Sequence, residues 1–593
     1  MYKQLLLFYF FLACWPAHLI AADTPKITSL TFEADKNPGL IAQDIICDIY
    51  GDSLIISIIP QEGSALPLKA TFATSNTASV WANDTRQESG VSVNDFSSPV
   101  YYTLLASDNT EKRYRVELVY TGLPVIYIDT EQQKPIDTKE TYVPANMHIL
   151  DASGTLFEAP MEIRGRGNST WNMPKKPYKV KLKTKASVLD MPADREWVLL
   201  ANYADKTLLR NYLALAMGQQ SALAYTPRMR NVDVVLNGKY QGTYLWGEQI
   251  KVSEDRVNIT ELSDTDTDSH GITGGYLLEA DMRLDEDFWF RTGNNAHITI
   301  KSPEDIPNAQ LNYIRDYVQQ AENAIMSSGD PNAYEQYLDT ETLIDWYWIN
   351  ELFKNHDAQF VSSVFMHKER GEKLRFGPLW DFDIAAGNIN YSGGDDPTGW
   401  WVRNNSFFVS PWIPQLFSNP AFRQKAEARW QELRETLVPS VMNLLETKAA
   451  ELKHSQRLNF YKWDILDSLV WPNPVATGSY EKEIDYLRTW LTTRVSWIDE
   501  EVGIVTATSA PDAEHLRIFP NPAKDFVSIQ LLRHTKVKEV SLYELSGRQV
   551  EDIHYTLSGD RIYLLLTGYA KGVYLLSVTS DTDDKMIQRI VVE

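Results

Sequence analysis

The pattern of apolar and polar positions divides the chain into three stretches of different character. Between residues 24 and 121, short runs of β-branched and aromatic residues alternate with turn residues, which is typical of strands. About seven strands in roughly 100 residues predict an N-terminal β-sandwich. Residues 516–593 show similar short strands and predict a small C-terminal β-sandwich.

The long central stretch, residues 122–504, begins with predicted strands and continues with predicted helices. Asp339 can cap one helix, Asn419 and Pro420 can begin another, and Gly503 follows a third. Five apolar residues at helical spacing lie on one face of a further helix: Leu311, Ile314, Val318, Ala321 and Ile325. Strands followed by helices predict an α+β domain with a mixed lobe and a helical lobe.

With 593 residues the chain is too long for one hydrophobic core, so several domains are expected. Residues 1–22 combine Lys3, an apolar run and small residues at the end, which is typical of a signal peptide. Residues 505–515 are mostly small and polar and predict a linker. No other segment is apolar enough to span a membrane. Once the leader is removed, Cys47 has no partner for an internal disulfide, and we expect it in the sandwich core.

The net charge of −22 argues against nucleic acid as a partner, because a phosphate backbone would be repelled. One window, residues 164–185, breaks this trend with eight Lys and Arg and no acidic residue. The window either forms a solvated pair of basic strands or binds an anion. Lys179, Lys181 and Lys183 alternate with apolar residues, so a strand would present all three lysines on one face.

Two acidic residues stand out in the stretch "FGPLWDFDIAAGN", where Asp381 and Asp383 flank one aromatic residue and a glycine follows. On an extended strand, residues at i and i+2 point the same way, so both carboxylates could share a metal ion. Without a metal, their repulsion would raise the pKa of one of them. The alternative is that both carboxylates cap the amides of a turn.

The C-terminal stretch carries three motifs in a fixed order. They read "IFPNPAKDFVSI", "VSLYELSGRQV" and "LTGYAKGVYLLSV", and "QRIVVE" follows them. This stretch resembles the C-terminal sorting domain of proteins exported by the type IX secretion system. The resemblance implies that the secretion machinery is a partner. It also implies passage across the outer membrane of a Gram-negative bacterium, followed by release or attachment at the cell surface.

The central stretch carries six ordered motifs between Leu123 and Gly503. They read "RGRGNSTWNMPKKPYKVKL", "WVLLANYADKTLLRN", "VDVVLNGKYQGTYLWGEQI", "GGYLLEAD", "NELFKNHD" and "GPLWDFDIAAGN". In this order they resemble the spore-coat CotH kinase family. The resemblance implies an atypical, strongly diverged protein-kinase-like fold. It also implies ATP-dependent phosphorylation of proteins, which is shown for some members of the family.

Phosphoryl transfer needs cations at the phosphates, carboxylates that hold a metal ion, and a group that orients the acceptor hydroxyl. The basic window supplies candidates for the first requirement. Lys179 and Lys181 lie on the predicted lysine strand, and either could reach the phosphates of ATP. Arg166 and Gly167 belong to a preceding glycine turn that could also approach phosphates.

The acidic residues supply candidates for the other two requirements. The resemblance places Asp381 at the metal-binding aspartate of the family, and Asp383 is the second candidate ligand for Mg²⁺ or Mn²⁺. Asp357 comes 24 residues before Asp381, after a predicted helix, which is the order of catalytic loop and metal turn in kinases. Asp357 would accept the proton of the acceptor hydroxyl. The alternative is that it caps the helix.

The sequence departs from the usual kinase pattern in two places. The helix after "NYADKTLLRN" contains no glutamate to pair with the strand lysine, and Glu248 or Glu279 could substitute from strands. Ser362 and Ser363 stand where a metal-binding asparagine is expected. Two further residues match the family and fit either a buried ion pair or a catalytic role: Asp205 and Arg210.

These observations predict an exported or cell-surface protein of the CotH family that acts as an ATP-dependent protein kinase. One alternative keeps the fold without the chemistry, as a surface scaffold or adhesin. In the N-terminal sandwich, the stretches "ESGVSVNDFSSPVYYTL" and "EKRYRVELVY" resemble the immunoglobulin-like modules of exported bacterial proteins, and this module would be a spacer. Another is a carbohydrate-active protein, because paired carboxylates suit glycoside hydrolysis and tryptophan rings can stack on sugars. The tryptophans considered for that stacking are Trp400, Trp401 and Trp412.

Overall fold

A computed structural model describes residues 24–60, 65–327, 329–404, 406–407, 409–504, 516–531, 537–544, 548–551, 553–558, 561–581 and 585–592. The predicted signal peptide and the predicted linker lie outside these described residues. The chain divides into two compact units, Met1–Tyr120 with Gly238–Tyr240 and Thr121–Asn237 with Gln241–Glu593. None of the described helices is both long and apolar enough to span a lipid bilayer.

The N-terminal unit consists of strands in two larger sheets, ordered β2-β1-β6 and β3-β4-β11-β10-β7-β8, and one pair, β5-β9. The strands are β1 (Lys26–Phe32), β2 (Ile45–Ile46), β3 (Asp48–Tyr50), β4 (Leu54–Ile59), β5 (Pro67–Lys69), β6 (Thr71–Ser75), β7 (Ser79–Ala82), β8 (Thr85–Arg86), β9 (Val93–Asp95), β10 (Val100–Leu105) and β11 (Glu111–Tyr120). Cys47 is buried with a free thiol in the core of this unit, as expected. The immunoglobulin-like class stays a prediction.

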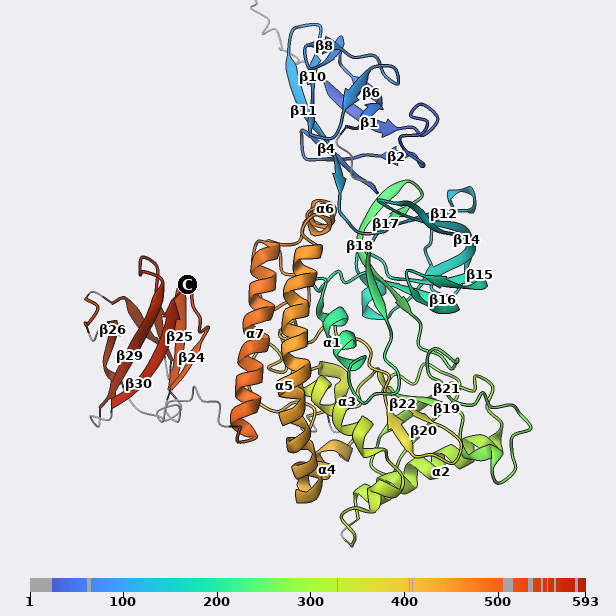
Figure 1. The fold of residues 1–593 in the computed structure, drawn as a ribbon, viewed down its shortest axis with the longest axis vertical. Coiled ribbons are helices and arrows are strands. Elements are labelled where there is room, and N and C mark those ends of the chain that lie inside the picture. Colours follow the sequence, from blue (N-terminus) through green and yellow to red (C-terminus); the bar gives the residue numbers. More distant parts are fainter. Residues whose placement is uncertain are drawn as a thin grey trace, which may run out of the picture. The chain divides into compact units, whose positions relative to one another are not determined.

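The first part of the central domain is a closed barrel with the order β12-β13-β14-β15-β16-β18-β17 (Figure 1). Its strands are β12 (Val125–Thr130), β13 (Val143–Asp151), β14 (Gly154–Gly165), β15 (Tyr178–Val188), β16 (Met191–Leu200), β17 (Met229–Leu236) and β18 (Lys239–Glu248). Side chains fill the interior, where the rings of Trp197 and Trp246 stack with centroids 5.4 Å apart. Val180 also points into this core, so the neighbouring Lys179 and Lys181 lie on the outer face, as the alternation predicts.

The second part of the central domain packs helices around an antiparallel sheet with the order β20-β21-β19-β22-β23. The strands are β19 (Tyr276–Ala280), β20 (Trp289–Arg291), β21 (His297–Ser302), β22 (Val364–Lys368) and β23 (Leu374–Phe376). The helices are α1 (Arg210–Gly218), α2 (Asn308–Ile325), α3 (Thr340–Leu352), α4 (Trp412–Ser418), α5 (Pro420–Glu451), α6 (Ser455–Lys462) and α7 (Tyr480–Glu501). The long helices α5 and α7 run side by side (Figure 1). Strands before helices confirm the α+β class.

Local signals in the sequence place the helix ends correctly. The side chain of Asp339 accepts a hydrogen bond from the amide of Thr342 and caps α3. Asn419 caps α5 in the same way, through the amide of Ala421. Gly503, just beyond α7, has a φ of +74°, a conformation that glycine adopts without strain. Tryptophans fill the core between the helices, and five of them are almost fully buried: Trp346, Trp348, Trp412, Trp430 and Trp490.

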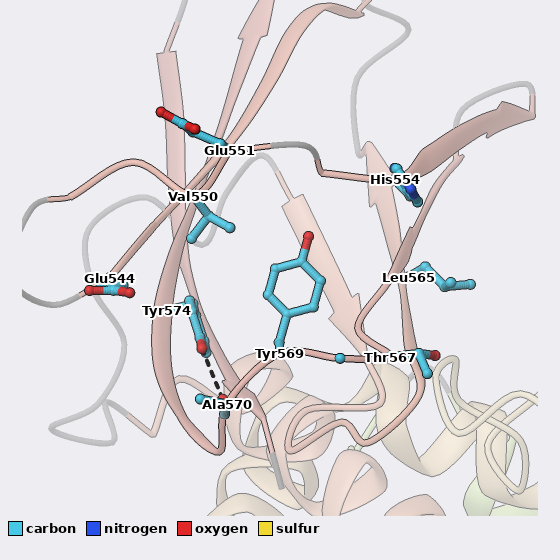
Figure 2. Close-up of a pocket in the computed structure, with 10 residues that line it drawn as sticks. Glu544, Val550, Glu551, His554, Leu565, Thr567, Tyr569, Ala570 and Tyr574 are labelled. Carbon is cyan, nitrogen blue, oxygen red and sulfur yellow. Dashed lines mark hydrogen bonds between the residues drawn. The ribbon is translucent and has the colours of Figure 1, made fainter.

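The C-terminal domain is a small sandwich of two sheets, ordered β24-β25-β28-β27 and β26-β29-β30. Its strands are β24 (Leu516–Phe519), β25 (Phe526–Leu531), β26 (Val537–Glu544), β27 (Tyr555–Ser558), β28 (Arg561–Leu565), β29 (Gly572–Ser580) and β30 (Lys585–Val592). A cavity of about 410 Å³ opens in this domain, and Figure 2 shows the ring of Tyr569 pointing into it. The hydroxyl of Tyr574 donates to the carbonyl of Ala570 at its edge.

Candidate active site

Asp381 and Asp383 lie in a loop that follows β23, so the expectation of an extended strand is wrong. Asp381 has a φ of +65°, in the left-handed region that residues other than glycine rarely adopt. Phe382 between them is fully buried, and the carboxyls of Asp381 and Asp383 are hydrogen-bonded neighbours. Burial, and then the charge of Asp381, raise the pKa of Asp383 well above its ordinary value. The two carboxylates therefore meet through a turn rather than through strand alternation.

Helix α1 holds this acidic loop in place. The amide of Phe382 donates to Oδ1 of Asn211 at 2.7 Å, and the guanidinium of Arg210 donates from Nε to the carbonyl of Ala385 at 3.0 Å. Arg210 is itself bound to Oδ1 of Asp205 at 2.6 Å, and both side chains are excluded from solvent. Of the two roles expected for Asp205 and Arg210, a buried ion pair or catalysis, the structure shows the ion pair.

Asp357 lies in a short 3₁₀ turn, His356–Ala358, shortly after α3. The amide of Asp357 donates to the side chain of Asn355, which caps this turn. Burial, and then the charge of Asp381, raise the pKa of Asp357 to about 7, although Arg283 opposes the effect. Asp357 also contributes to the raised pKa of Asp383, so the fold brings all three predicted acidic residues together electrostatically.

One cation of the basic window lies beside these carboxylates, and it is Arg166. Burial lowers the pKa of Arg166, and the charges of Asp381 and Asp383 oppose this effect. The guanidinium lies 5.3 Å from the ring centroid of Trp380, which precedes Asp381. Arg166 therefore joins the barrel to the acidic loop.

Gly167 follows Arg166 with a φ of +84°. A Cβ atom at this position would lie 2.2 Å from Oγ1 of Thr170, so both the backbone conformation and the space require glycine. The turn that carries Arg166 is therefore tight, as its glycine motif suggests.

Lys179 is bound to a glutamate that the sequence did not reveal as its partner. Its Nζ lies 2.7 Å from Oε2 of Glu196, and Nζ of Lys251 lies 3.2 Å from the other oxygen. Burial alone would raise the pKa of Glu196, but the hydrogen bond and charge of Lys179, together with Lys251, lower it to about 2. Lys181 is paired in register with Glu196 across β15 and β16, and its Nζ lies 6.0 Å from the ring centroid of Tyr142.

The two glutamates proposed as partners of the strand lysine bind other residues. Glu248 accepts hydrogen bonds from Arg228 and Tyr225. Glu279 lies 3.6 Å from Nζ of Lys301, and burial raises its pKa to about 7. Both proposals are wrong, because the partner comes from a neighbouring barrel strand, and sequence alone did not indicate that pairing.

A second basic residue, Arg283, lies close enough to Asp357 for its charge to lower the pKa of that carboxyl. Its Nη2 donates to Oδ2 of Asp281 at 2.7 Å and also to Oγ of Ser362. The amide of Ser363 donates to Oε1 of Glu279 at 3.2 Å. Ser362 and Ser363 therefore bind the residues around Asp357, and no motif in the sequence singled out Arg283.

The tryptophans considered for sugar stacking lie mainly in the core. Trp412 is fully buried and donates from Nε1 to Glu322. Trp401 is 6% exposed and stacks on the ring of His356. Trp400 is half-buried and packs against Trp497. The prediction of a sugar-binding surface from these three residues is therefore wrong.

Together, the barrel, the helical part with its carboxylate cluster and the C-terminal sandwich define a multidomain α+β protein. The protein family described as "CotH kinase protein" matches residues 163–498, which are more than half of the chain. A second family, described as "Secretion system C-terminal sorting domain", matches residues 517–593. The chain therefore belongs to the CotH kinase family and carries a sorting domain, which implies export by the type IX secretion system.

Comparisons with individual proteins add little to the family assignment. No curated protein matches the chain. Among solved structures, one similar chain is a presumptive glycoside hydrolase from Bacteroides thetaiotaomicron, with 20% sequence identity and a TM-score of 0.13. The match covers 30% of this chain and 51% of that protein, about half of its length. At such a TM-score the likeness supports no statement on fold or function.

Proposed function

We propose that the central domain transfers the γ-phosphoryl group of ATP to a hydroxyl of a protein acceptor outside the cell. The observation that carries this proposal is the electrostatic cluster of Asp357, Asp381 and Asp383, with Arg166 beside it. Phosphoryl transfer relies on positioning and on charge, and this cluster offers carboxylates for a metal ion and a cation for phosphates. Membership of the CotH kinase family supports the same reaction.

Asp381 and Asp383 would hold Mg²⁺ or Mn²⁺. Burial is the main cause of the raised pKa of Asp383, and the negative charges of Asp381, Asp205 and Asp357 add to it. A divalent cation would offset these charges. Mg²⁺ prefers carboxylate oxygens, and one or two of them are enough when water and phosphate complete the shell. When bound, the metal neutralises the charge that develops on the phosphates.

Lys179 and Lys181 on the outer face of the barrel, together with Arg166 and Gly167, would contact the phosphates of ATP. Glu196 would keep the ammonium group of Lys179 in one position, because the two groups form a hydrogen-bonded ion pair at 2.7 Å. This arrangement supplies the lysine–glutamate pair that the sequence lacked on a helix.

Asp357 would act as the base. A carboxylate with a pKa of about 7 can take the proton from the oxygen of the acceptor hydroxyl near neutral pH. That oxygen then forms the new bond to phosphorus, while the bond to the leaving oxygen of ADP breaks. Arg283 lies close enough to favour the ionised form of Asp357.

Transfer of labelled γ-phosphate to protein tests this proposal. Asp357→Asn and Asp381→Asn should each lower incorporation at least about 100-fold relative to the native chain. The control is Asp316→Asn, because Asp316 is an exposed carboxylate on α2. Equal incorporation by the native chain and both site variants would refute the proposal.

A non-catalytic surface scaffold is the second candidate, and one observation favours it. Ser362 and Ser363 stand where a kinase carries a metal-binding asparagine, and they bind Arg283 and Glu279 instead. A scaffold would retain the fold without binding Mg-ATP. Thermal unfolding with and without Mg-ATP separates the two candidates, since only the kinase should gain stability from the nucleotide.

A further inference from the structure

An exposed apolar surface lies on the segment that connects α6 to α7. Leu469 is 66% exposed, Trp471 is 58% exposed and Val475 is 39% exposed. Single exposed apolar residues are common on protein surfaces, but several in one short segment are typical of an interaction site. We call these three residues, together with Tyr391, the docking surface.

The segment is anchored firmly, so the exposure of Trp471 is built into the fold. Nζ of Lys206 donates to the carbonyl of Ser468 at 2.7 Å. The amide side chain of Asn473 donates to the carbonyl of Ala204 at 2.7 Å and to Oδ1 of Asn388 at 2.8 Å. A surface that is already held in place loses little conformational entropy when it binds a partner.

Tyr391 connects this surface to the carboxylate cluster. Its ring is parallel to that of Trp471, with centroids 6.1 Å apart and planes within 8°. The same ring is nearly perpendicular to that of His356, with ring centroids 4.8 Å apart, and His356 directly precedes Asp357. Burial raises the pKa of Tyr391, and the charges of Asp357 and Asp383 add to this effect. Two aromatic rings, those of Tyr391 and His356, therefore connect Trp471 to the segment of the proposed base.

The two segments that carry the docking surface also expose acidic residues. Asp464 and Asp467 are exposed on the same segment as Trp471, and Asp395 and Asp396 are exposed on the loop that carries Tyr391. Carboxylates around an apolar centre attract Lys and Arg and repel acidic partners. An apolar segment that also carries basic residues fits both features.

We propose that the docking surface binds an apolar and basic polypeptide segment of the acceptor protein, and so brings the hydroxyl next to it to Asp357. This inference rests on the proposed kinase function, because it assigns the partner of the same site. The residues of the docking surface would contact the acceptor protein and not the nucleotide.

Fluorescence anisotropy with labelled peptides and the full chain tests the proposal. One peptide contains Leu, Phe and Lys around a single serine; a second replaces Leu and Phe with Gly, and a third replaces Lys with Glu. The first should bind best. Trp471→Ala should weaken its binding about tenfold. The control is Trp289→Ala, because Trp289 on β20 is 44% exposed and should change binding less than about twofold.

Thermal unfolding with Mg-ATP, measured on the same samples, separates this inference from the proposed function. If Mg-ATP stabilises both the native chain and Trp471→Ala, but both bind the first peptide equally, the docking inference is wrong and the kinase proposal stands. If peptide binding depends on Trp471 but Mg-ATP has no effect, the surface is a docking site and the kinase proposal is wrong. Tighter, Trp471-dependent binding of cellohexaose would assign the surface to a glycan instead.

Discussion

Arg210→Met should destabilise the central domain and disturb the acidic loop, although Arg210 lies outside the proposed reaction site. The guanidinium binds Asp205 at 2.6 Å and the carbonyls of Ala385 and Ala386 at 3.0 and 3.3 Å. Its loss leaves a fully buried carboxylate without a counter-ion and two carbonyls without this donor.

The expected loss follows from these contacts. Removal of one partner from a buried ion pair typically costs roughly 3–5 kcal/mol. The unsatisfied carbonyls add about 1 kcal/mol. Asp205 keeps hydrogen bonds from the amides of Thr207 and Arg210 and from the hydroxyl of Thr207, which reduces the loss. We therefore expect a free energy of unfolding about 4 kcal/mol lower than that of the native chain.

Urea unfolding followed by tryptophan fluorescence measures this loss, because 15 of the 17 tryptophans lie between Trp171 and Trp497, within the central domain. The control is the double variant Asp205→Leu with Arg210→Met, which removes both charges and should recover roughly half of the lost stability. A loss below about 1 kcal/mol, or a double variant less stable than the single one, would refute this account of the pair.

Three further predictions follow from single residues. Glu196→Gln should lower the free energy of unfolding by about 2–3 kcal/mol at pH 7, because Lys179 and Lys251 hold the pKa of Glu196 at about 2 in the folded chain. In unfolding measured over a range of acidic pH, the difference from the native chain should persist above pH 4.5 and fade as the pH drops toward 2. Asp357→Asn should raise the melting temperature at pH 8 but not at pH 4, because ionisation of Asp357 costs stability as the pH rises to about 7; equal melting temperatures at pH 8 would contradict this. Gly167→Ala should lower the free energy of unfolding in urea by about 1–3 kcal/mol, and Gly122→Ala should lower it less. Both glycines have a similar positive φ, but a Cβ atom at Gly122 would meet open space, whereas one at Gly167 would meet Thr170.

Sequence patterns predicted the elements of this protein well, because their causes are local. The caps at Asp339 and Asn419 depend on one side chain and the amide two or three residues further on. The lysine strand depends on alternation alone, and Val180 and its apolar neighbours do face the barrel core. Closure of the strands into a barrel depends on contacts between distant segments, and no local pattern reports it.

The candidate site shows the same division. Asp357, Asp381 and Asp383 could be selected from their order in the chain, and the fold does bring their charges together. The partner of Lys179, Glu196, and the basic neighbour of Asp357, Arg283, could not be predicted. Glu196 binds Lys179 across neighbouring strands. Arg283, whose charge acts on Asp357, lies in a loop 74 positions earlier in the chain.

The anchors of the acidic loop and of the docking surface are shared, which links the two proposals physically. Asn388 donates to the carbonyls of Asp383 and Ala204, and its Oδ1 accepts from Asn473. Ala204, directly before the buried Asp205, accepts from both asparagines. A shift of the acidic loop would therefore move the segment that carries Trp471 as well. Asn388→Ala should accordingly weaken peptide binding and Mg-ATP stabilisation together, whereas Trp471→Ala should weaken only peptide binding. If Asn388→Ala changed one of these and left the other intact, the shared anchor would not couple the two surfaces.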